Sequence, residues 1–325
     1  MQPYFTKAEL QQAAALVHDH MAPTPLHEWP TLSLHSGAQV WVKHENHAPT
    51  GAFKVRGGIT FIDWLRRTEP QARGIITATR GNHGQSQARA AKAAGLRALI
   101  YVPQGNSAEK NAAMRAFGAE LVEFGADFDA ARLEAQRVGA AEGLTFVPPF
   151  HRELARGVAT YGWEMLRAAP DLDTVYVPIG CGSGICGVIA ARDALGLKTK
   201  VVGVVSEQAM TAKLSFDAGR LIETPAARTF ADGMAVRVPD PDAFAIYSGG
   251  AERIIAVSEA AIAGAIRAYF EDIHTLAEGA GAAPLAALLQ EKPFMRGKKV
   301  GLVLSGGNID TGWFRTVLAG DVPQV

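Results

Sequence analysis

GIITATRGNHGQSQARAAKAAG, residues 74–95, contains the strand-to-helix step that decides the fold class. The apolar run 74–79 predicts a buried strand, and the segment 82–95 predicts a helix that ends at its glycine. The same alternation continues along the chain, with strands predicted at 97–103, 119–125 and 144–149 and helices at 107–118 and 127–143. Regular alternation of strands and helices predicts right-handed βαβ units and a parallel sheet.

A second set of alternating elements follows after residue 156. Its strands are predicted at 174–180, 199–207 and 298–308, and its helices at 180–195 and 257–270, the latter capped by Ser258. A separate helix is predicted near the N-terminus, at Lys7–His18. The predicted fold class is therefore α/β, with two open, twisted parallel sheets.

Loops rich in Gly, Pro and His interrupt the alternation near residues 55 and 155. Such loops are typical of the points where a chain passes between domains. We therefore expect residues 1–55 and 156–325 to form a large domain and residues 56–155 to form a small α/β domain.

The composition is that of an ordinary globular protein. The chain has 325 residues, 48% of them hydrophobic, and its 32 basic and 32 acidic side chains give no net charge. This balance does not favour nucleic acid or an anionic membrane as a partner, and no apolar run is long enough to span a bilayer. We read no signal peptide, and two cysteines, Cys181 and Cys186, are too few for an extracellular disulfide scaffold. We expect a cytoplasmic enzyme or binding protein.

Four loops at strand ends carry unusual residues, and ligands of parallel sheets bind at strand ends. They are TGAFKVRGG (50–58), TRGNHGQ (79–85), GCGSGICG (180–187) and SGGN (305–308). In the third loop, backbone N–H groups and a helix N-terminus could bind a phosphate. Its glycines at 182, 184 and 187, with Glu207 further on, also fit a dinucleotide fingerprint. A tight glycine turn without a ligand is the remaining alternative.

The other loops suit different ligand groups. The helix start at 79–85 could bind a carboxylate, with Asn82 offering an amide, although His83 is as readily an ordinary structural histidine. Lys54 is a lone amine between Phe53 and Val55, and partial burial would make it available as a nucleophile. An amine, a phosphate cradle and a carboxylate cradle together suit pyridoxal phosphate and an amino-acid substrate.

The chain resembles the serine/threonine dehydratase family of fold-type II pyridoxal-phosphate enzymes, part of the tryptophan synthase β-subunit superfamily. The resemblance runs from TPL (24–26) to SGGN (305–308). Its motifs, which together overturn the dinucleotide interpretation, are KHENHAPTGAFKVRGG (43–58), ATRGNHGQSQA (78–88), GVATYGWEML (157–166), PIGCGSGICG (178–187), TFADGMAV (229–236) and AEGAGAAPLAAL (277–288). This resemblance implies a cofactor cleft between two α/β domains, and a homodimer.

The resemblance also implies roles for individual residues. Lys54 would hold the cofactor aldehyde and act as the base at Cα, Phe53 would pack beside the ring, Asn82 would bond the 3′-oxygen, and Ser305 would face the pyridine nitrogen. The phosphate would be held by Gly180, Cys181, Gly182, Ser183 and Gly184. The substrate carboxylate would be bound by the loop Thr79, Arg80, Gly81, Asn82 and His83.

The implied reaction is the β-elimination of a β-hydroxy-α-amino acid such as threonine or serine to a 2-oxo acid and ammonia. The hydroxyl would leave as water, with its proton supplied from the phosphate side. Open alternatives are a dehydratase for a bulkier substrate such as L-phenylserine or 3-hydroxyaspartate, a β-replacement synthase, and an amino-acid racemase. A non-catalytic phosphate or nucleotide binder is a further alternative that Lys54 disfavours.

Four departures from the family pattern concern the substrate side. Arg80 stands where a racemase carries a serine, which disfavours racemisation because arginine stays protonated. His151 and Arg152 replace acidic residues and are expected to change the charge near the substrate entrance. Val205 and Thr211 stand where racemase-like members bind a divalent cation, so we expect no metal site. The chain ends soon after SGGN, so we expect no regulatory domain and no isoleucine feedback. The spacing of HENH (44–47) does not fit zinc.

Overall fold

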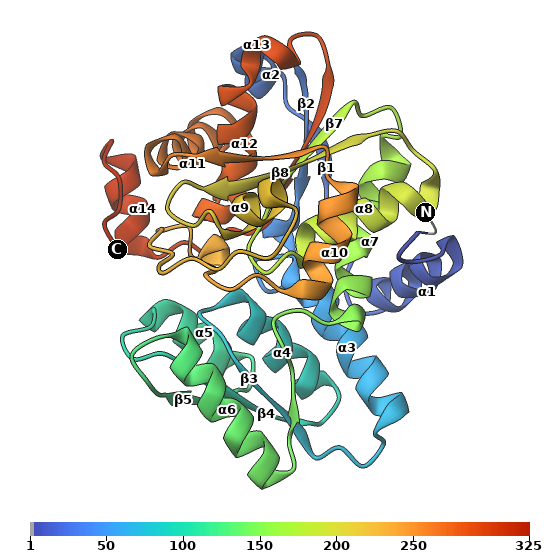
Figure 1. Ribbon diagram of the computed structural model, residues 1–325, viewed down its shortest axis with the longest axis vertical. Helices are drawn as coiled ribbons and strands as arrows, with labels where there is room; N and C mark the ends of the chain where they lie inside the picture. Colours follow the sequence, from blue (N-terminus) through green and yellow to red (C-terminus); the bar gives the residue numbers. More distant parts are fainter. Residues whose placement is uncertain (1–2) are drawn as a thin grey trace.

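The computed structural model describes residues 3–325 and contains two separate sheets (Figure 1). The larger sheet has six strands in the order β1-β2-β10-β7-β8-β9, and only β1 runs antiparallel to its neighbour. Its strands are β1 (Leu26–Glu28), β2 (Gln39–His44), β7 (Thr174–Pro178), β8 (Lys200–Ser206), β9 (Arg253–Val257) and β10 (Lys299–Leu304).

The smaller sheet has four parallel strands in the order β5-β4-β3-β6. They are β3 (Gly74–Ala78), β4 (Arg97–Val102), β5 (Glu120–Glu123) and β6 (Thr145–Phe146). Four helices accompany this part of the chain, namely α3 (Lys54–Thr68), α4 (Asn82–Ala93), α5 (Ala108–Ala116) and α6 (Phe128–Glu142).

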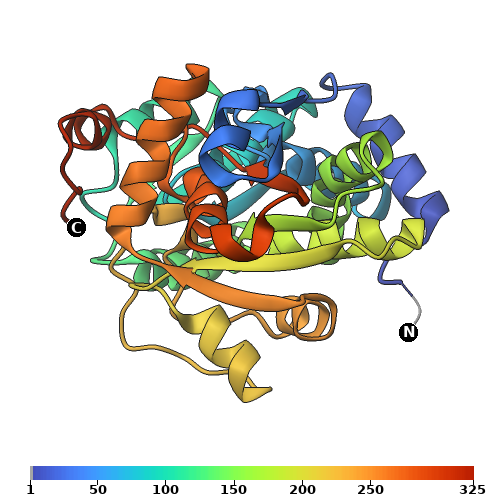
Figure 2. The ribbon, with the colours of Figure 1, turned by 90° about the horizontal axis from the view of Figure 1, so that it is seen from above.

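Helices cover both faces of the larger sheet, as Figure 2 shows from above. The helices of this part of the chain are α1 (Lys7–His18), α2 (Pro30–Ser36), α7 (Arg152–Ala168), α8 (Ser183–Leu195), α9 (Thr211–Ala218), α10 (Pro241–Gly250), α11 (Glu259–Ile273), α12 (Gly279–Gln290), α13 (Lys292–Met295) and α14 (Thr311–Leu318). Short 3-10 turns occur at η1 (Glu45–His47) and η2 (Asp232–Met234).

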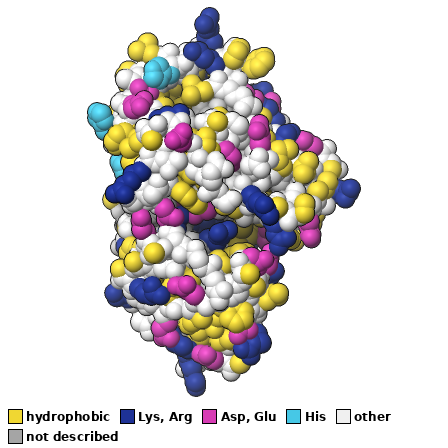
Figure 3. All heavy atoms as spheres, turned by 90° about the vertical axis from the view of Figure 1, so that its left-hand side faces the viewer, with side chains coloured by type: hydrophobic (Ala, Val, Ile, Leu, Met, Phe, Trp, Pro, Cys, Tyr) yellow, Lys and Arg dark blue, Asp and Glu magenta, His cyan; other side chains and the backbone are white. Residues whose placement is uncertain are grey.

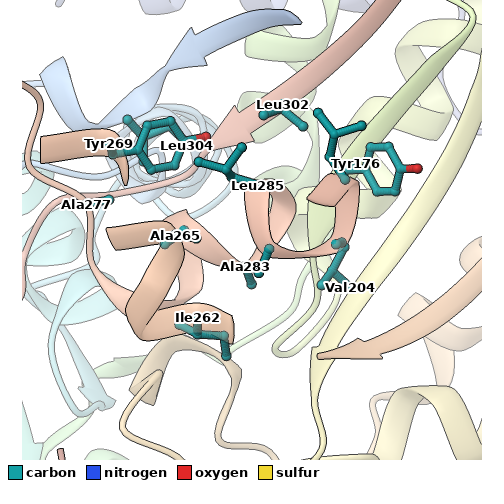
Figure 4. Packing of buried hydrophobic residues seen from close by; sticks show 14 of the residues in the cluster. Tyr176, Val204, Ile262, Ala265, Tyr269, Ala277, Ala283, Leu285, Leu302 and Leu304 are labelled. Atoms are coloured by element: carbon teal, nitrogen blue, oxygen red, sulfur yellow. The ribbon is translucent and has the colours of Figure 1, made fainter. Parts of the chain in front are cut away.

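The strands of the larger sheet are apolar on both sides because both sides are covered. Successive side chains of a strand point to opposite faces, and this alternation divides the core in two. On one face, Tyr176, Val204 and Leu302 pack with residues of α11 and α12 (Figure 4). On the other face, Val175 and Val303 pack with residues of α7 and α8.

Helix α3 packs closely against α7, and this contact fixes the position of Lys54 at the start of α3. The approach depends on Gly157 of α7, because a Cβ there would collide with the backbone carbonyl oxygen of Arg56. Helix α7 in turn packs along α8, whose first residue is Ser183. The α3–α7–α8 layer therefore sets where the lysine lies relative to the glycine loop before α8.

A buried ion network holds the first turn of α3. Arg56 is fully buried and donates to Glu45 at 2.8 Å through Nε and to Glu164 at 2.6 Å through Nη1. Lys43 donates to Glu164 and to the carbonyl oxygen of Thr24. Two carboxylates and two cations thus meet beneath α3, and each charge has a partner.

The predicted fold class is confirmed, and most predicted elements lie where the sequence placed them. The N-terminal helix spans Lys7–His18, and Ser107 and Ser258 cap α5 and α11. No prediction from the sequence covers β1 or β9, nor several helices, among them the 15-residue α3 and the 12-residue α12. Among residues 3–325, no helix is long and apolar enough to cross a membrane. Basic and acidic side chains are interspersed on the face drawn in Figure 3, which is hollowed near its middle.

Candidate active site

A cavity of about 150 Å³ lies where strands of both sheets end. Residues that follow β3, β7 and β10 line it, together with the start of α3. The structure brings every predicted site residue to this cavity: Phe53, Lys54, Thr79, Arg80, Gly81, Asn82, His83, Gly180, Cys181, Gly182, Ser183, Gly184 and Ser305. Their individual roles stay predictions.

Lys54 extends from the first residue of α3 into this cavity. Its Nζ donates to the hydroxyl oxygen of Ser183 at 3.0 Å and lies 5.1 Å from the centre of the Phe53 ring. The Phe53 ring is held edge-on against Tyr161. Burial lowers the pKa of Lys54, and the nearby Cys181 offsets part of this effect. A lowered pKa makes the free amine more available as a nucleophile or base.

The loop between β7 and α8 has the geometry of an anion cradle. Its Gly182 has φ of 97°, in the left-handed region that favours glycine, and its Cβ position is also closed by Ala243. No side chain caps the N-terminus of α8. The backbone N–H groups at the start of this 13-residue helix are therefore available to an anion such as a phosphate.

Thr79 shapes the loop that precedes α4. Its hydroxyl oxygen accepts hydrogen bonds from the backbone N–H groups of Gly81 and Gly84, at 3.0 and 3.3 Å. Those two N–H groups are thus occupied within the loop. Arg80 is exposed, lines the cavity, and has no hydrogen-bond partner among the described residues. It is the cation of this loop that is free to meet a ligand.

His83 is neutral in this setting. Burial lowers its pKa to about 3, the charge of Lys54 acts in the same direction, and a hydrogen bond with the Val147 carbonyl opposes them. Its Nε2 is buried without a partner among residues 3–325. The side chain therefore brings no positive charge to a carboxylate, although the backbone N–H of the same residue can still serve one.

Asn82 is oriented by two residues that sequence reasoning did not assign. Its amide nitrogen donates to both oxygens of Glu278, at 2.8 and 3.1 Å, and its amide oxygen accepts from Asn308 at 2.7 Å. Glu278 is 3% exposed, and burial raises its pKa to about 7, with the charge of Asp232 adding to the effect. Glu278 lies in the family-like segment AEGAGAAPLAAL (277–288), but nothing in the sequence around it indicates a contact with Asn82.

Lys110 and Asp232 form an ion pair across the cavity, and both line it. Lys110 comes from α5, beside the smaller sheet, and Asp232 from η2, beside the larger one. The side chain of Lys110 passes under Gly81. Sequence reasoning missed this pair as well, because a lysine on an amphipathic helix is normally a surface residue.

Several residues singled out by sequence lie outside the cavity lining. His44 accepts a hydrogen bond from Trp29 at 2.9 Å. His151 packs against aromatic rings of α3, and Arg152 forms an ion pair with Glu9 at 2.7 Å. These two residues therefore contact α3 and α1 rather than the cavity. Among residues 3–325, no group of three or more His, Cys, Asp or Glu side chains is arranged to hold a metal ion.

The family described as "Pyridoxal-phosphate dependent enzyme" matches residues 17–306. The chain belongs to this family. Pyridoxal phosphate is therefore its cofactor, and the fit is visible in the site: a buried amine stands beside an uncapped helix N-terminus whose glycine loop leaves room for a phosphate.

Relatives of the enzyme carry dehydratase names. It is 36% identical over 316 residues to a putative threonine dehydratase of Sinorhizobium fredii, covering 96% of this chain and 95% of the relative. It is 38% identical over 275 residues to an L-threonine ammonia-lyase of Geobacter sulfurreducens, covering 84% of this chain and 68% of that one.

Solved structures of similar proteins include two types of enzyme. Threonine deaminase isoform 2 from Solanum lycopersicum matches with a TM-score of 0.89 and 28% identity, covering 98% of this chain and 95% of that chain. Maize serine racemase matches with a TM-score of 0.90 and 26% identity, covering 97% of each. The fold is thus shared between elimination and racemisation enzymes.

Proposed function

We propose that this enzyme eliminates water from a β-hydroxy-α-amino acid, threonine or serine, and yields a 2-oxo acid and ammonia. The observation that carries the proposal is the Lys54 amine, whose pKa is lowered by burial beside the glycine loop. The threonine ammonia-lyase and dehydratase names of its relatives support the same chemistry. Arg80 supports elimination rather than racemisation. Racemisation needs an acid–base group on the face of the substrate opposite Lys54, and an arginine, which stays protonated, is poorly suited to that role.

The residues of the chain would divide the work as follows. Pyridoxal phosphate, when bound, would supply an electron sink that makes the Cα proton easier to remove. Lys54 takes the Cα proton through its uncharged amine. The free backbone N–H groups of the loop before α4 bind the substrate carboxylate, while Asn82, fixed by Glu278 and Asn308, orients the cofactor ring. Ser305, which is 3% exposed, would offer a neutral hydroxyl to the ring nitrogen of the cofactor.

The test is 2-oxo-acid release from serine, threonine, phenylserine and 3-hydroxyaspartate. Wild-type enzyme should release product from at least one of them, and Lys54→Ala should lose both turnover and the visible absorbance of the bound cofactor. Lys198→Ala is the control, because that lysine is exposed. Normal turnover in Lys54→Ala would refute the assignment, and no release from any of the four substrates would refute the function.

The same panel addresses the choice of substrate. Threonine or serine is the expected substrate, and a bulkier substrate such as phenylserine or 3-hydroxyaspartate is the competing one. Arg80 lines the cavity and has no hydrogen-bond partner among the described residues, so a contact with the substrate is part of the proposal. Arg80→Ala should change the ratio of kcat/KM values across the panel more than it changes cofactor binding.

Three broader features complete the proposal. The sheet composition supports a large domain of residues 1–55 and 156–325 and a small domain of residues 56–155, with the cavity between them. A homodimer is the expected assembly, which sedimentation would test. Cys181 and Cys186 are both free thiols, which supports a reducing, cytoplasmic location.

A further inference from the structure

Ser183 stands out within the cradle because its side chain contacts the reactive amine. Its hydroxyl oxygen accepts a hydrogen bond from Lys54 Nζ at 3.0 Å, and the residue is 2% exposed. Its own hydroxyl hydrogen has no acceptor among residues 3–325. A hydroxyl that accepts on one side and donates on the other can pass a proton.

Ser183 is also the one polar hydroxyl in the loop 180–184. The other side chain of this loop belongs to Cys181, and burial raises the pKa of that thiol. Cys181 has no hydrogen bond to Lys54. Three of the five residues in this loop are glycines, and the hydroxyl of Ser183 is the side-chain group of the loop that contacts the lysine.

We propose that Ser183 is a catalytic residue that relays a proton from Lys54 to the departing hydroxyl of the substrate. The proposal deepens the proposed function and rests on it. Lys54 Nζ takes the Cα proton, the Cα–H electrons form the Cα–Cβ double bond, and the Cβ–O bond breaks with its electron pair going to oxygen. Ser183 gives its hydroxyl proton to that oxygen and regains one from Lys54, so water leaves and both residues return to their starting states.

Hydroxide is a poor leaving group, so its departure needs a proton donor. The β-oxygen is only two bonds from the Cα whose proton Lys54 removes. A donor that acts on the same face of the substrate as Lys54 would therefore lie beside the amine, as Ser183 does.

Other proton donors around the cavity are less suitable. Lys110 is held by Asp232, and Glu278 accepts hydrogen bonds from Asn82. His83 is neutral, because its pKa is lowered by burial, and it cannot act as a strong acid. None of these three side chains hydrogen-bonds Lys54, whereas Ser183 does.

A change of leaving group tests the relay. L-serine loses a hydroxyl, which needs a proton, whereas β-chloro-L-alanine loses chloride, which needs none. Ser183→Ala should lower kcat for L-serine about 100-fold or more, the usual contribution of a positioned acid, and should leave kcat for β-chloro-L-alanine within about threefold. Ser183→Thr keeps a hydroxyl and should recover much of the L-serine activity.

Two further measurements separate the relay from cofactor binding and folding. Cofactor affinity of each variant is measured by titrating cofactor-free enzyme, and kinetics are then run at saturating cofactor. In cofactor-free enzyme, the pH dependence of Lys54 acylation, followed by mass spectrometry, reports the contact directly. Loss of the hydroxyl that accepts from the amine should shift the apparent pKa of Lys54 downward by about one unit.

The outcomes are distinct. Equal losses for both substrates at saturating cofactor, or unchanged L-serine turnover in Ser183→Ala, would overturn the relay and leave the proposed function standing. Wild-type enzyme that releases product from β-chloro-L-alanine but from no β-hydroxy amino acid would overturn the proposed function, and the relay with it. An unshifted Lys54 titration would overturn the contact on which the relay depends.

Discussion

Glu164→Gln should lower the free energy of unfolding far more than the loss of one surface charge would. Glu164 lies on α7, is 10% exposed, and accepts hydrogen bonds from Arg56 and Lys43, which are 0% and 1% exposed. Glutamine has nearly the same shape but brings no negative charge. The substitution therefore leaves two buried cations facing the single carboxylate of Glu45.

The size of the effect follows from the pKa of Glu164. Burial acts to raise this pKa, but the charges and hydrogen bonds of Arg56 and Lys43 outweigh it and lower the pKa from 4.5 to about 2. A shift of this size corresponds to about 3 kcal/mol of folding free energy. Because the folded-state pKa is the lower one, this stability is present above pH 4.5 and is lost as the pH falls towards 2. Removing one partner of a buried pair costs about 3–5 kcal/mol, which agrees with this figure.

The assay is urea-induced unfolding followed by circular dichroism at pH 7 and across pH 4.5 to 3. Glu164→Gln should lower the free energy of unfolding at pH 7 by about 3 kcal/mol, and its stability should depend less on pH in the acidic range. Glu120→Gln is the control, because Glu120 pairs with Arg97 at the surface, and it should change stability by less than about 1 kcal/mol. A Glu164→Gln protein within about 0.5 kcal/mol of wild type would refute the reasoning.

Three other perturbations follow from the same structure. Gly157→Ala should destabilise the fold by about 1–3 kcal/mol and lower turnover, because its methyl group collides with the backbone of α3. The helical Gly264→Ala is the control, because its methyl group meets only the end of the Arg267 side chain at 3.8 Å and should not destabilise the fold; calorimetry compares the two. Glu278→Gln should stabilise the enzyme by up to about 3 kcal/mol at pH 8 and hardly at pH 4. The pKa of Glu278 is raised from 4.5 to about 7 on folding, so the cost of its carboxyl group builds up between these two pH values and is complete above pH 7; equal effects of the substitution at pH 4 and pH 8 would contradict this. EDTA should leave turnover unchanged, because Val205 and Thr211 offer no carboxylate; activity lost with EDTA and restored by Mg²⁺ would contradict it.

Local patterns were enough to predict most of the fold. The strands of parallel sheets are continuous apolar runs, and the helices between them have clear caps such as Ser107 and Ser258, so each element is encoded within about fifteen residues. β9 was missed although it is as long as β3 and β7, because RIIAV begins with an arginine and is only partly buried, so it is not a continuous apolar run. The residues that line the cavity were predicted because each lies at a strand end, where parallel sheets bind ligands.

Contacts between distant segments could not be predicted in the same way. Asn82 and Glu278 are 196 positions apart, and Lys110 and Asp232 are 122 apart. Neither pair has a periodic or spacing signal, because a buried ion or amide is recognised only by what surrounds it in three dimensions. Arg152 is an example of the opposite kind. The sequence placed it near the substrate entrance, but its side chain forms an ion pair with Glu9 of α1.

The buried ion network explains how Lys54 can keep a lowered pKa while two carboxylates lie beneath its helix. A carboxylate close to the amine would favour the ammonium form and make it unreactive. Glu45 and Glu164 are instead paired with Arg56 and Lys43, and burial is the leading cause of the lowered pKa of Lys54. The same four charges therefore fix the start of α3 and shield its first residue from an acidic partner. A variant that unbalances them should change the pKa of the lysine as well as the stability of the fold.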